Sequence, residues 1–182
     1  MLPTNIFVDT EILLDNIIPE RREQFKCSCL LIDEVSNGRL TAFTADYVLS
    51  EIMGILKTTK EIRKGTAHLL YETLTPTEKA AIQSIIVSLT NMPNLKIFTP
   101  IKPISQKDIY DLVRSICIQT KDALVLLTAL EAKSKLKELE LVTRDAKLMV
   151  RSKSQIASAH PSAYINKCPS DCLSKFSCRY RK

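Results

Sequence analysis

The sequence predicts an α/β fold in which a mostly parallel central sheet lies between two layers of helices. Short apolar stretches that suit buried strands recur along the chain, and longer helical patterns separate them. Strands separated by helices pair in parallel, because a parallel connection has to cross the sheet. The chain has 182 residues, 45% hydrophobic and 25% charged, which suits one domain with its own core.

The first half of the chain is expected to supply two strands and several helices. The first strand is an apolar run that ends at Asp9, and Pro19 suits the first position of a helix. The Asn37-Gly38 pair is typical of a helix end. The predicted elements are a strand at 5–8, helices at 10–17 and from 19 to Asn37-Gly38, a strand at 39–43, a helix capped by Thr44 that runs to about 58, and a helix at 61–74.

The second half begins with a strong helix start at Thr75-Pro76-Thr77-Glu78. It combines a capping threonine, a proline at the first helical position and a glutamate three residues after the cap. The predicted elements are helices at 76–89, 105–117 and 121–135, strands at 95–98 and 139–143, a helix at 146–150 and a strand at 163–165. No linker precedes about residue 166, so we expect one domain at 1–166 and a tail at 167–182.

Four acidic residues occupy positions where burial is costly unless a positive charge compensates it. Asp9 and Asp145 follow predicted strands, Asp122 opens an apolar helix, and Glu51 lies within an apolar helical stripe. Ligands of open parallel α/β sheets bind beyond the carboxyl ends of the strands, so these side chains could share one crevice. Simpler interpretations stay open: helix capping for the aspartates, and the exposed edge of a stripe for Glu51.

A divalent cation would compensate such a group of carboxylates. Mg²⁺ and Mn²⁺ prefer oxygen ligands, and such an ion activates water and stabilises charge on a scissile phosphate. No histidine is required, and His68 and His160 are expected to be structural or exposed. With only three glycines, the chain lacks a glycine-rich loop that would cradle a nucleotide.

Taken together, these segments resemble the PIN-domain ribonucleases over about residues 5–166. The matching motifs are Val8-Asp9-Thr10, Val48-Leu49-Ser50-Glu51-Ile52, Asp122-Ala123-Leu124 and Leu141-Val142-Thr143-Arg144-Asp145. The resemblance implies cleavage of RNA with Mg²⁺ or Mn²⁺, leaving a 5′-phosphate and a 3′-hydroxyl. It also implies that Asp9, Glu51, Asp122 and Asp145 form the acidic quartet, with Thr143 as a polar residue beside it.

The chain departs from this family in two ways. Glu11 follows Thr10, where the family often has asparagine, and it could add a ligand or face solvent. The chain is also longer than the compact toxins of the family. The resemblance thus points either to a VapC-like toxin with an antitoxin partner or to an RNA-processing nuclease, and homodimers are common among such proteins. The alternatives from other classes are a non-catalytic module that binds RNA or protein and a phosphoacceptor regulator.

The C-terminal tail is basic and rich in cysteine. The whole chain carries a net charge of +6, and residues 167–182 hold five basic residues and one acid. Such a tail fits a polyanion such as RNA, although a charge run by itself favours a solubilising role. Cys168, Cys172 and Cys178, with His160 before them, could supply the four ligands of a structural zinc ion; a disulfide or free thiols are the alternatives.

The expected location is the cytoplasm. The longest apolar runs are too short to cross a bilayer, and the first residues show no basic segment followed by an apolar stretch. We therefore expect no membrane partner.

Overall fold

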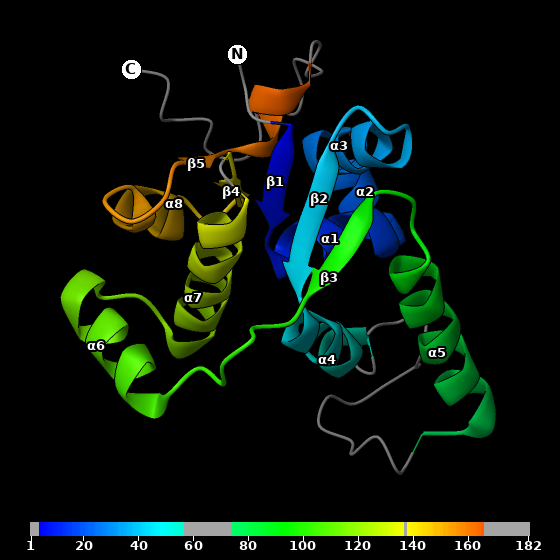
Figure 1. The fold of residues 1–182 in the computed structure, drawn as a ribbon. Helices are drawn as coiled ribbons and strands as arrows, with labels where there is room; N and C mark the ends of the chain where they lie inside the picture. The colour runs from blue at the N-terminus through cyan, green and yellow to red at the C-terminus, as the bar shows by residue number, and fades with distance from the viewer. Residues whose placement is uncertain (1–3, 57–73, 137, 166–182) are drawn as a thin grey trace.

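The computed structural model of the protein describes residues 4–56, 74–136 and 138–165. Their centre is a five-stranded sheet in which every strand pair is parallel, with the strand order β3-β2-β1-β4-β5 (Figure 1). The strands are β1 (Asn5–Val8), β2 (Thr41–Ala45), β3 (Leu95–Phe98), β4 (Glu140–Val142) and β5 (Ser158–Ala159). The predicted α/β class and the parallel sheet are confirmed.

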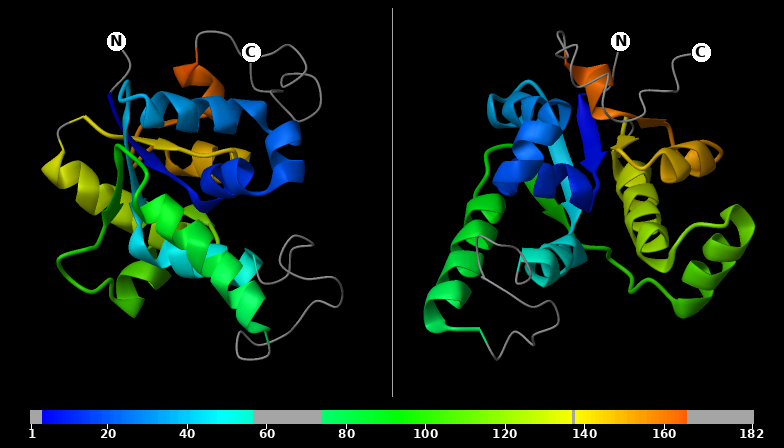
Figure 2. Two further views of the ribbon diagram at one scale, coloured as in Figure 1. Left: turned by 90° about the vertical axis from the view of Figure 1, so that its right-hand side faces the viewer. Right: turned by 180° about the vertical axis from the view of Figure 1, so that it is seen from behind.

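The helices cover both faces of this sheet. Helices α1, α2 and α3 pack together on one side, and α7 packs against β2 and β4 on the other (Figures 1 and 2). The helices are α1 (Thr10–Ile17), α2 (Pro19–Gln24), α3 (Lys26–Ser36), α4 (Asp46–Leu56), α5 (Pro76–Thr90), α6 (Gln106–Ile116), α7 (Thr120–Lys135) and α8 (Ala146–Ser152), followed by the 3-10 turn η2 (Pro161–Tyr164).

The middle of the sheet is apolar because it is covered on both sides. Ile6, Phe7 and Val8 of β1 are fully buried, which explains why this strand reads as a continuous apolar run without alternation. In α7, Ala123, Leu126 and several other residues are buried as well. An apolar helix therefore lies against an apolar sheet, as its sequence indicates.

The predicted helix from Pro19 to Gly38 is interrupted. Pro19 is the first residue of α2, as expected, but Phe25 leaves helical geometry with φ −120° and ψ 54° and separates α2 from α3. The guanidinium of Arg144 lies 3.5 Å from the centre of the Phe25 ring. Local periodicity cannot predict a contact between residues so far apart in the chain.

Two further boundaries differ from the prediction. Thr44 belongs to β2, where its hydroxyl donates to the Val8 carbonyl at 3.0 Å, so α4 begins only at Asp46. The last strand is at 158–159 and not at 163–165, because residues 161–164 form η2. Pro161 opens this turn, and the backbone N–H of Ser162 donates to the His160 ring.

Other expectations fall outside the ranges that the structure describes. These are the predicted helix at 61–74, the tail at 167–182 and the zinc ligands Cys168, Cys172 and Cys178. Among the helices within the ranges, none is long and apolar enough to span a membrane.

The strand order contains a topological switch point. From β1 the chain moves outward to β2 and β3, and it then returns to place β4 and β5 on the opposite side of β1. The chain that leaves β1 and the chain that leaves β4 therefore turn toward opposite sides of the sheet. This leaves a crevice beyond the carboxyl ends of these two strands.

Candidate metal centre

A small open cleft lies at this switch point, and all four predicted acidic residues line it. Asp9 follows β1, Asp145 follows β4, Glu51 comes from the middle of α4, and Asp122 from the first turn of α7. The other residues that line the cleft are Thr10, Glu11, Leu14, Arg21, Ile55, Lys121 and Val125. Side chains separated by more than a hundred residues in the chain thus share one cavity.

Asp9 is the most enclosed of the four, with only 8% of its surface exposed. It caps α1, and its Oδ1 accepts from the Thr10 N–H at 2.7 Å. Its Oδ2 accepts from the Thr143 hydroxyl at 2.8 Å. The capping role considered from the sequence is therefore real, and it coexists with a place in the cleft.

Glu51 reaches the cleft from the apolar stripe of α4, whose neighbours Val48 and Ile52 are buried. Its Oε2 accepts from the Thr10 hydroxyl at 2.5 Å, and its Oε1 lies 3.7 Å from the Lys121 ammonium. The side chain is 25% exposed. Glu51 is therefore directed toward other polar groups of the cleft and is not an exposed stripe edge.

Asp145 caps α8 through its Oδ1, which accepts from the N–H groups of Lys147 at 2.7 Å and Leu148 at 3.0 Å. Its own N–H donates to the hydroxyl of Thr143 at 3.0 Å. Since the same hydroxyl donates to Asp9, the fully buried Thr143 connects two of the acidic residues.

The carboxylates raise one another's proton affinity. Burial raises the pKa of Asp9 to about 6, although hydrogen bonds from Thr143 and Thr10 oppose the change. The pKa of Asp122 is also raised, first by burial and next by the negative charge of Asp145. The charge in the cleft is therefore only partly balanced by the cations that line it.

The phenol of Tyr47 is affected by the same charges. Burial first, and then the charges of Asp9, Glu51 and Asp122, raise the pKa of Tyr47 above its usual range. Its hydroxyl is buried and has no hydrogen-bond partner within the described parts of the chain. The negative charge of the cleft residues thus also acts on a buried side chain of α4.

This donor set suits a hard divalent cation. Carboxylate oxygens are the ligands that Mg²⁺ and Mn²⁺ prefer. Over residues 4–56, 74–136 and 138–165, however, no three Asp, Glu, His or Cys side chains are close enough to enclose an ion by themselves. Mg²⁺ usually keeps several waters and is bound through one or two carboxylates, so it fits an open cleft of this kind. A closed site of four protein ligands, as a structural zinc ion requires, does not fit it.

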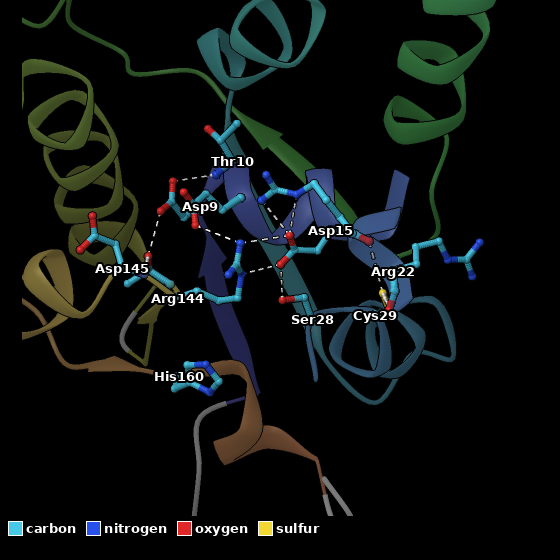
Figure 3. A network of polar contacts seen from close by, with 12 residues as sticks. Asp9, Thr10, Asp15, Arg22, Ser28, Cys29, Arg144, Asp145 and His160 are labelled. Carbon is cyan, nitrogen blue, oxygen red and sulfur yellow. Dashed lines mark hydrogen bonds and ion pairs between the residues drawn. The ribbon is translucent and has the colours of Figure 1, made fainter. Parts of the chain in front are cut away.

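Sequence reasoning missed a second polar network beside the cleft. Asp15 of α1 is fully buried, and the guanidinium of Arg144 and the hydroxyl of Ser28 lie against it (Figure 3). The guanidinium of Arg21 also pairs with it, at 2.8 Å. The available signal was an acid within a short helix whose Ile12, Leu13 and Leu14 are apolar. This network differs from the cleft because its buried carboxylate, that of Asp15, is paired with two arginines.

Two residues weighed from the sequence are now placed. Glu11 lines the cleft and forms an ion pair with Arg144 at 3.1 Å, so it is a paired residue and not a free ligand. His160 lies apart from the labelled acidic side chains in Figure 3. Its Nδ1 lies 2.9 Å from the Ser162 hydroxyl.

Comparisons with known proteins assign no family. No family model matches the chain, and no curated protein matches it. Among solved structures, it is similar to a chain from the crystal structure of VapBC2 from Rickettsia felis bound to a DNA fragment from their promoter. The identity is 14% and the TM-score 0.49, over 86% of this chain and 98% of that one. A similarity of this degree establishes no family for the chain.

Proposed function

We propose that the protein is an endoribonuclease that hydrolyses RNA phosphodiester bonds with Mg²⁺ or Mn²⁺. The observation that carries the proposal is the cleft at the switch point, where Asp9, Glu51, Asp122 and Asp145 gather from four separate elements. Their order along the chain is also the basis of the resemblance to the PIN-domain ribonucleases. A binding cleft at this place is what the topology of an open parallel sheet favours.

We assign the residues of the cleft separate roles in binding the ion and the RNA. A bound Mg²⁺ or Mn²⁺ supplies Lewis acidity and an activated water. Asp9, fixed by Thr10 and Thr143, and Asp122 would hold the ion directly, and Glu51 and Asp145 would act on it through the waters that it keeps. Lys121 lies at the rim with 57% of its side chain exposed, so its ammonium can meet a phosphate oxygen.

The direct test is cleavage of a labelled single-stranded RNA by the purified protein. We expect turnover with Mg²⁺ or Mn²⁺, none with a chelator, and a loss of at least a hundredfold in Asp9→Asn and Asp122→Asn, since each removes a charged ligand of the ion. Asp33→Asn is the matched control, because Asp33 is exposed on α3 and is absent from the cleft. Full activity of Asp9→Asn would refute the assignment of the site.

The ends of the products give an independent check. Attack by a metal-activated water leaves a 5′-phosphate and a 3′-hydroxyl. Attack by the neighbouring 2′-hydroxyl leaves a cyclic phosphate, which is also the mark of a contaminating metal-independent ribonuclease. Products that end in cyclic phosphates would therefore contradict the proposal even if RNA were degraded.

A non-catalytic RNA-binding module is the second candidate. The observation that favours it is that the described side chains do not enclose a ready-made site for an ion. This candidate predicts RNA binding that a chelator leaves unchanged, with no turnover under any of the ionic conditions above. The same RNA and the same variants therefore separate the two candidates.

We also propose two biological settings for the nuclease. As the toxin of a toxin–antitoxin pair, it would arrest bacterial growth on expression, Asp9→Asn would abolish the arrest, and an antitoxin encoded beside it would bind the protein. As an RNA-processing enzyme, it would cleave a defined RNA without arresting growth. Sedimentation of the purified protein would show whether it forms the homodimer expected from the resemblance.

A further inference from the structure

Arg144 stands between two residues of the candidate metal centre but is not itself among the residues that line the cleft. Thr143 before it bonds to Asp9, and Asp145 after it lines the cleft. The Arg144 side chain is only 14% exposed, and its guanidinium lies 3.5 Å from the centre of the Phe25 ring. An arginine enclosed in this way is fixed in one orientation by its stacking and its ion pairs.

The ion pairs of Arg144 all go to one face of α1. Its Nη2 lies 3.1 Å from Glu11 Oε2 and 3.1 Å from Asp15 Oδ1. Its Nε lies 2.5 Å from Asp15 Oδ2, a close ion-pair contact without the alignment of a hydrogen bond. Glu11 and Asp15 are four residues apart and therefore neighbours on the helix surface.

Asp15 is itself held from the other side. The Ser28 hydroxyl donates to its Oδ2 at 2.7 Å, and Arg21 Nε donates to its Oδ1 at 2.9 Å. Asp15 is fully buried, and burial raises its pKa while Arg144, Ser28 and Arg21 oppose the rise. The two arginines balance Glu11 and Asp15, so this network needs no added cation.

Two ties therefore join the start of α1 to the turn between β4 and α8. The hydroxyl of Thr143 joins Asp9 to the backbone of Asp145. Arg144 joins the same turn to Asp15 of α1 (Figure 3) and also pairs with Glu11 of that helix. Both contacts join the segment that carries Asp9 to the segment that carries Asp145.

We propose that Asp15 and Arg144 are positioning residues of the metal centre. Their ion pair sets the spacing of Asp9 and Asp145, and Arg144 also keeps Glu11 from competing for the ion. The inference rests on the proposed function, because it concerns the geometry of the same carboxylates. Groups that orient metal ligands typically change metal affinity or activity 10- to 100-fold when they are removed, which is about the effect expected here.

The test is direct Mn²⁺ binding, measured by titration calorimetry without RNA. We expect Arg144→Gln and Asp15→Asn to weaken the dissociation constant for Mn²⁺ by about tenfold or more. Arg144→Lys, which keeps the charge but loses the planar fork, should lie between them and wild type. The double variant should bind no more weakly than Arg144→Gln, because both changes break one connection.

Arg39→Gln is the matched control. Arg39 also pairs with a carboxylate, that of Glu34, but its side chain is 63% exposed and it lies near the amino end of β2, away from the cleft. Each variant is measured below its melting temperature, with its fold checked by circular dichroism. Should Arg144→Gln fail to fold, Arg144→Lys and Asp15→Asn carry the measurement.

The outcomes separate this inference from the proposed function. Normal Mn²⁺ binding by wild type and by the folded variants, with only a lower melting temperature, would show a purely structural ion pair and overturn the positioning role. Failure of wild type itself to bind Mn²⁺ would overturn the proposed function, and the inference with it. RNA kinetics give a second readout: kcat should fall in Arg144→Gln while KM for RNA stays close to wild type.

Discussion

At the scale of single residues, Asp9 has the most constrained position in the cleft. It is almost enclosed, and its pKa is about 6 against an ordinary value of 3.8. The folded protein therefore holds a proton on Asp9 more tightly than the unfolded chain does. It follows that this residue lowers stability progressively as the pH rises from about 4 to about 6, and by a constant amount above that.

Asp9→Asn should therefore change stability in a pH-dependent manner. In a chelator at pH 7.5 we expect the variant to be more stable than wild type by about 1–3 kcal/mol, since two pKa units correspond to nearly 3 kcal/mol and the amide replaces the carboxylate's hydrogen bonds imperfectly. At pH 4 the advantage should vanish. Urea unfolding of both proteins at the two pH values measures this, and an equal difference at both would contradict the raised pKa.

Substitutions of Thr143 can distinguish the role of its hydroxyl group from the role of its side-chain volume. Thr143→Val keeps the volume but removes both hydrogen bonds, leaving buried groups of Asp9 and Asp145 without partners, at about 1–3 kcal/mol. Its cleavage rate should fall about tenfold. Thr143→Ser retains the hydroxyl and should stay near wild type in rate. Chemical unfolding and single-turnover cleavage are the measurements, and equal rates for the two variants would argue against the bridging role.

The four acidic residues of the cleft could be predicted from the sequence, whereas the pairing of Asp15 with Arg144 could not. Asp9, Asp122 and Asp145 stand at element boundaries, which local composition reveals, and Glu51 interrupts an apolar stripe. Asp15 and Arg144 are 129 residues apart, and their pairing follows from the packing of α1 against the turn after β4. No spacing along the chain encodes such a contact.

At the scale of elements, the helix starts were the most predictable features. The capping box at the start of α5 forms as the sequence indicates, with Thr75 accepting from the Glu78 N–H and the Glu78 side chain accepting from the Thr75 N–H. Boundaries set by tertiary contacts were not predictable. Phe25, which separates α2 from α3, stacks with Arg144, and Thr44, which belongs to β2, donates its hydroxyl to Val8 of the neighbouring strand.

Thr75→Ala should reduce stability without affecting the cleft. Loss of a capping side chain costs about 1 kcal/mol, because an N–H group of the first turn loses its partner. Since α5 contributes no residue to the cleft, metal binding and RNA cleavage should be unchanged. Thr75→Ser serves as the control that retains the cap. A loss of cleavage in Thr75→Ala at a temperature where it is folded would show that α5 influences the site.

At the scale of the whole molecule, the order of strands and helices was readable from the sequence, but the strand order β3-β2-β1-β4-β5 was not. That order decides which loops meet, and it brings the loops after β1 and β4 together. The acidic residues were the sequence feature that indicated which loops lie together. Carboxylates repel one another, so a fold that gathers them implies a compensating positive charge such as a metal ion.

Metal binding should accordingly stabilise the entire fold. An ion that binds only the folded state adds about 2.7 kcal/mol when its concentration is a hundred times the dissociation constant. We expect the melting temperature to rise with added Mg²⁺ or Mn²⁺, to return to its starting value with a chelator, and to rise much less in Asp122→Asn. Differential scanning fluorimetry over a series of ion concentrations measures this. A melting temperature insensitive to both ions would argue against a metal centre.

The central position of β1 in the sheet has a consequence for folding during synthesis. The hydroxyl of Thr143 bonds to Asp9 across 134 residues of sequence, so β1 can pair with its second neighbour only after β4 has been synthesised. Contacts of such long range close slowly. A nascent or prematurely terminated chain that ends before β4 would therefore lack Asp145 and could form only part of the cleft.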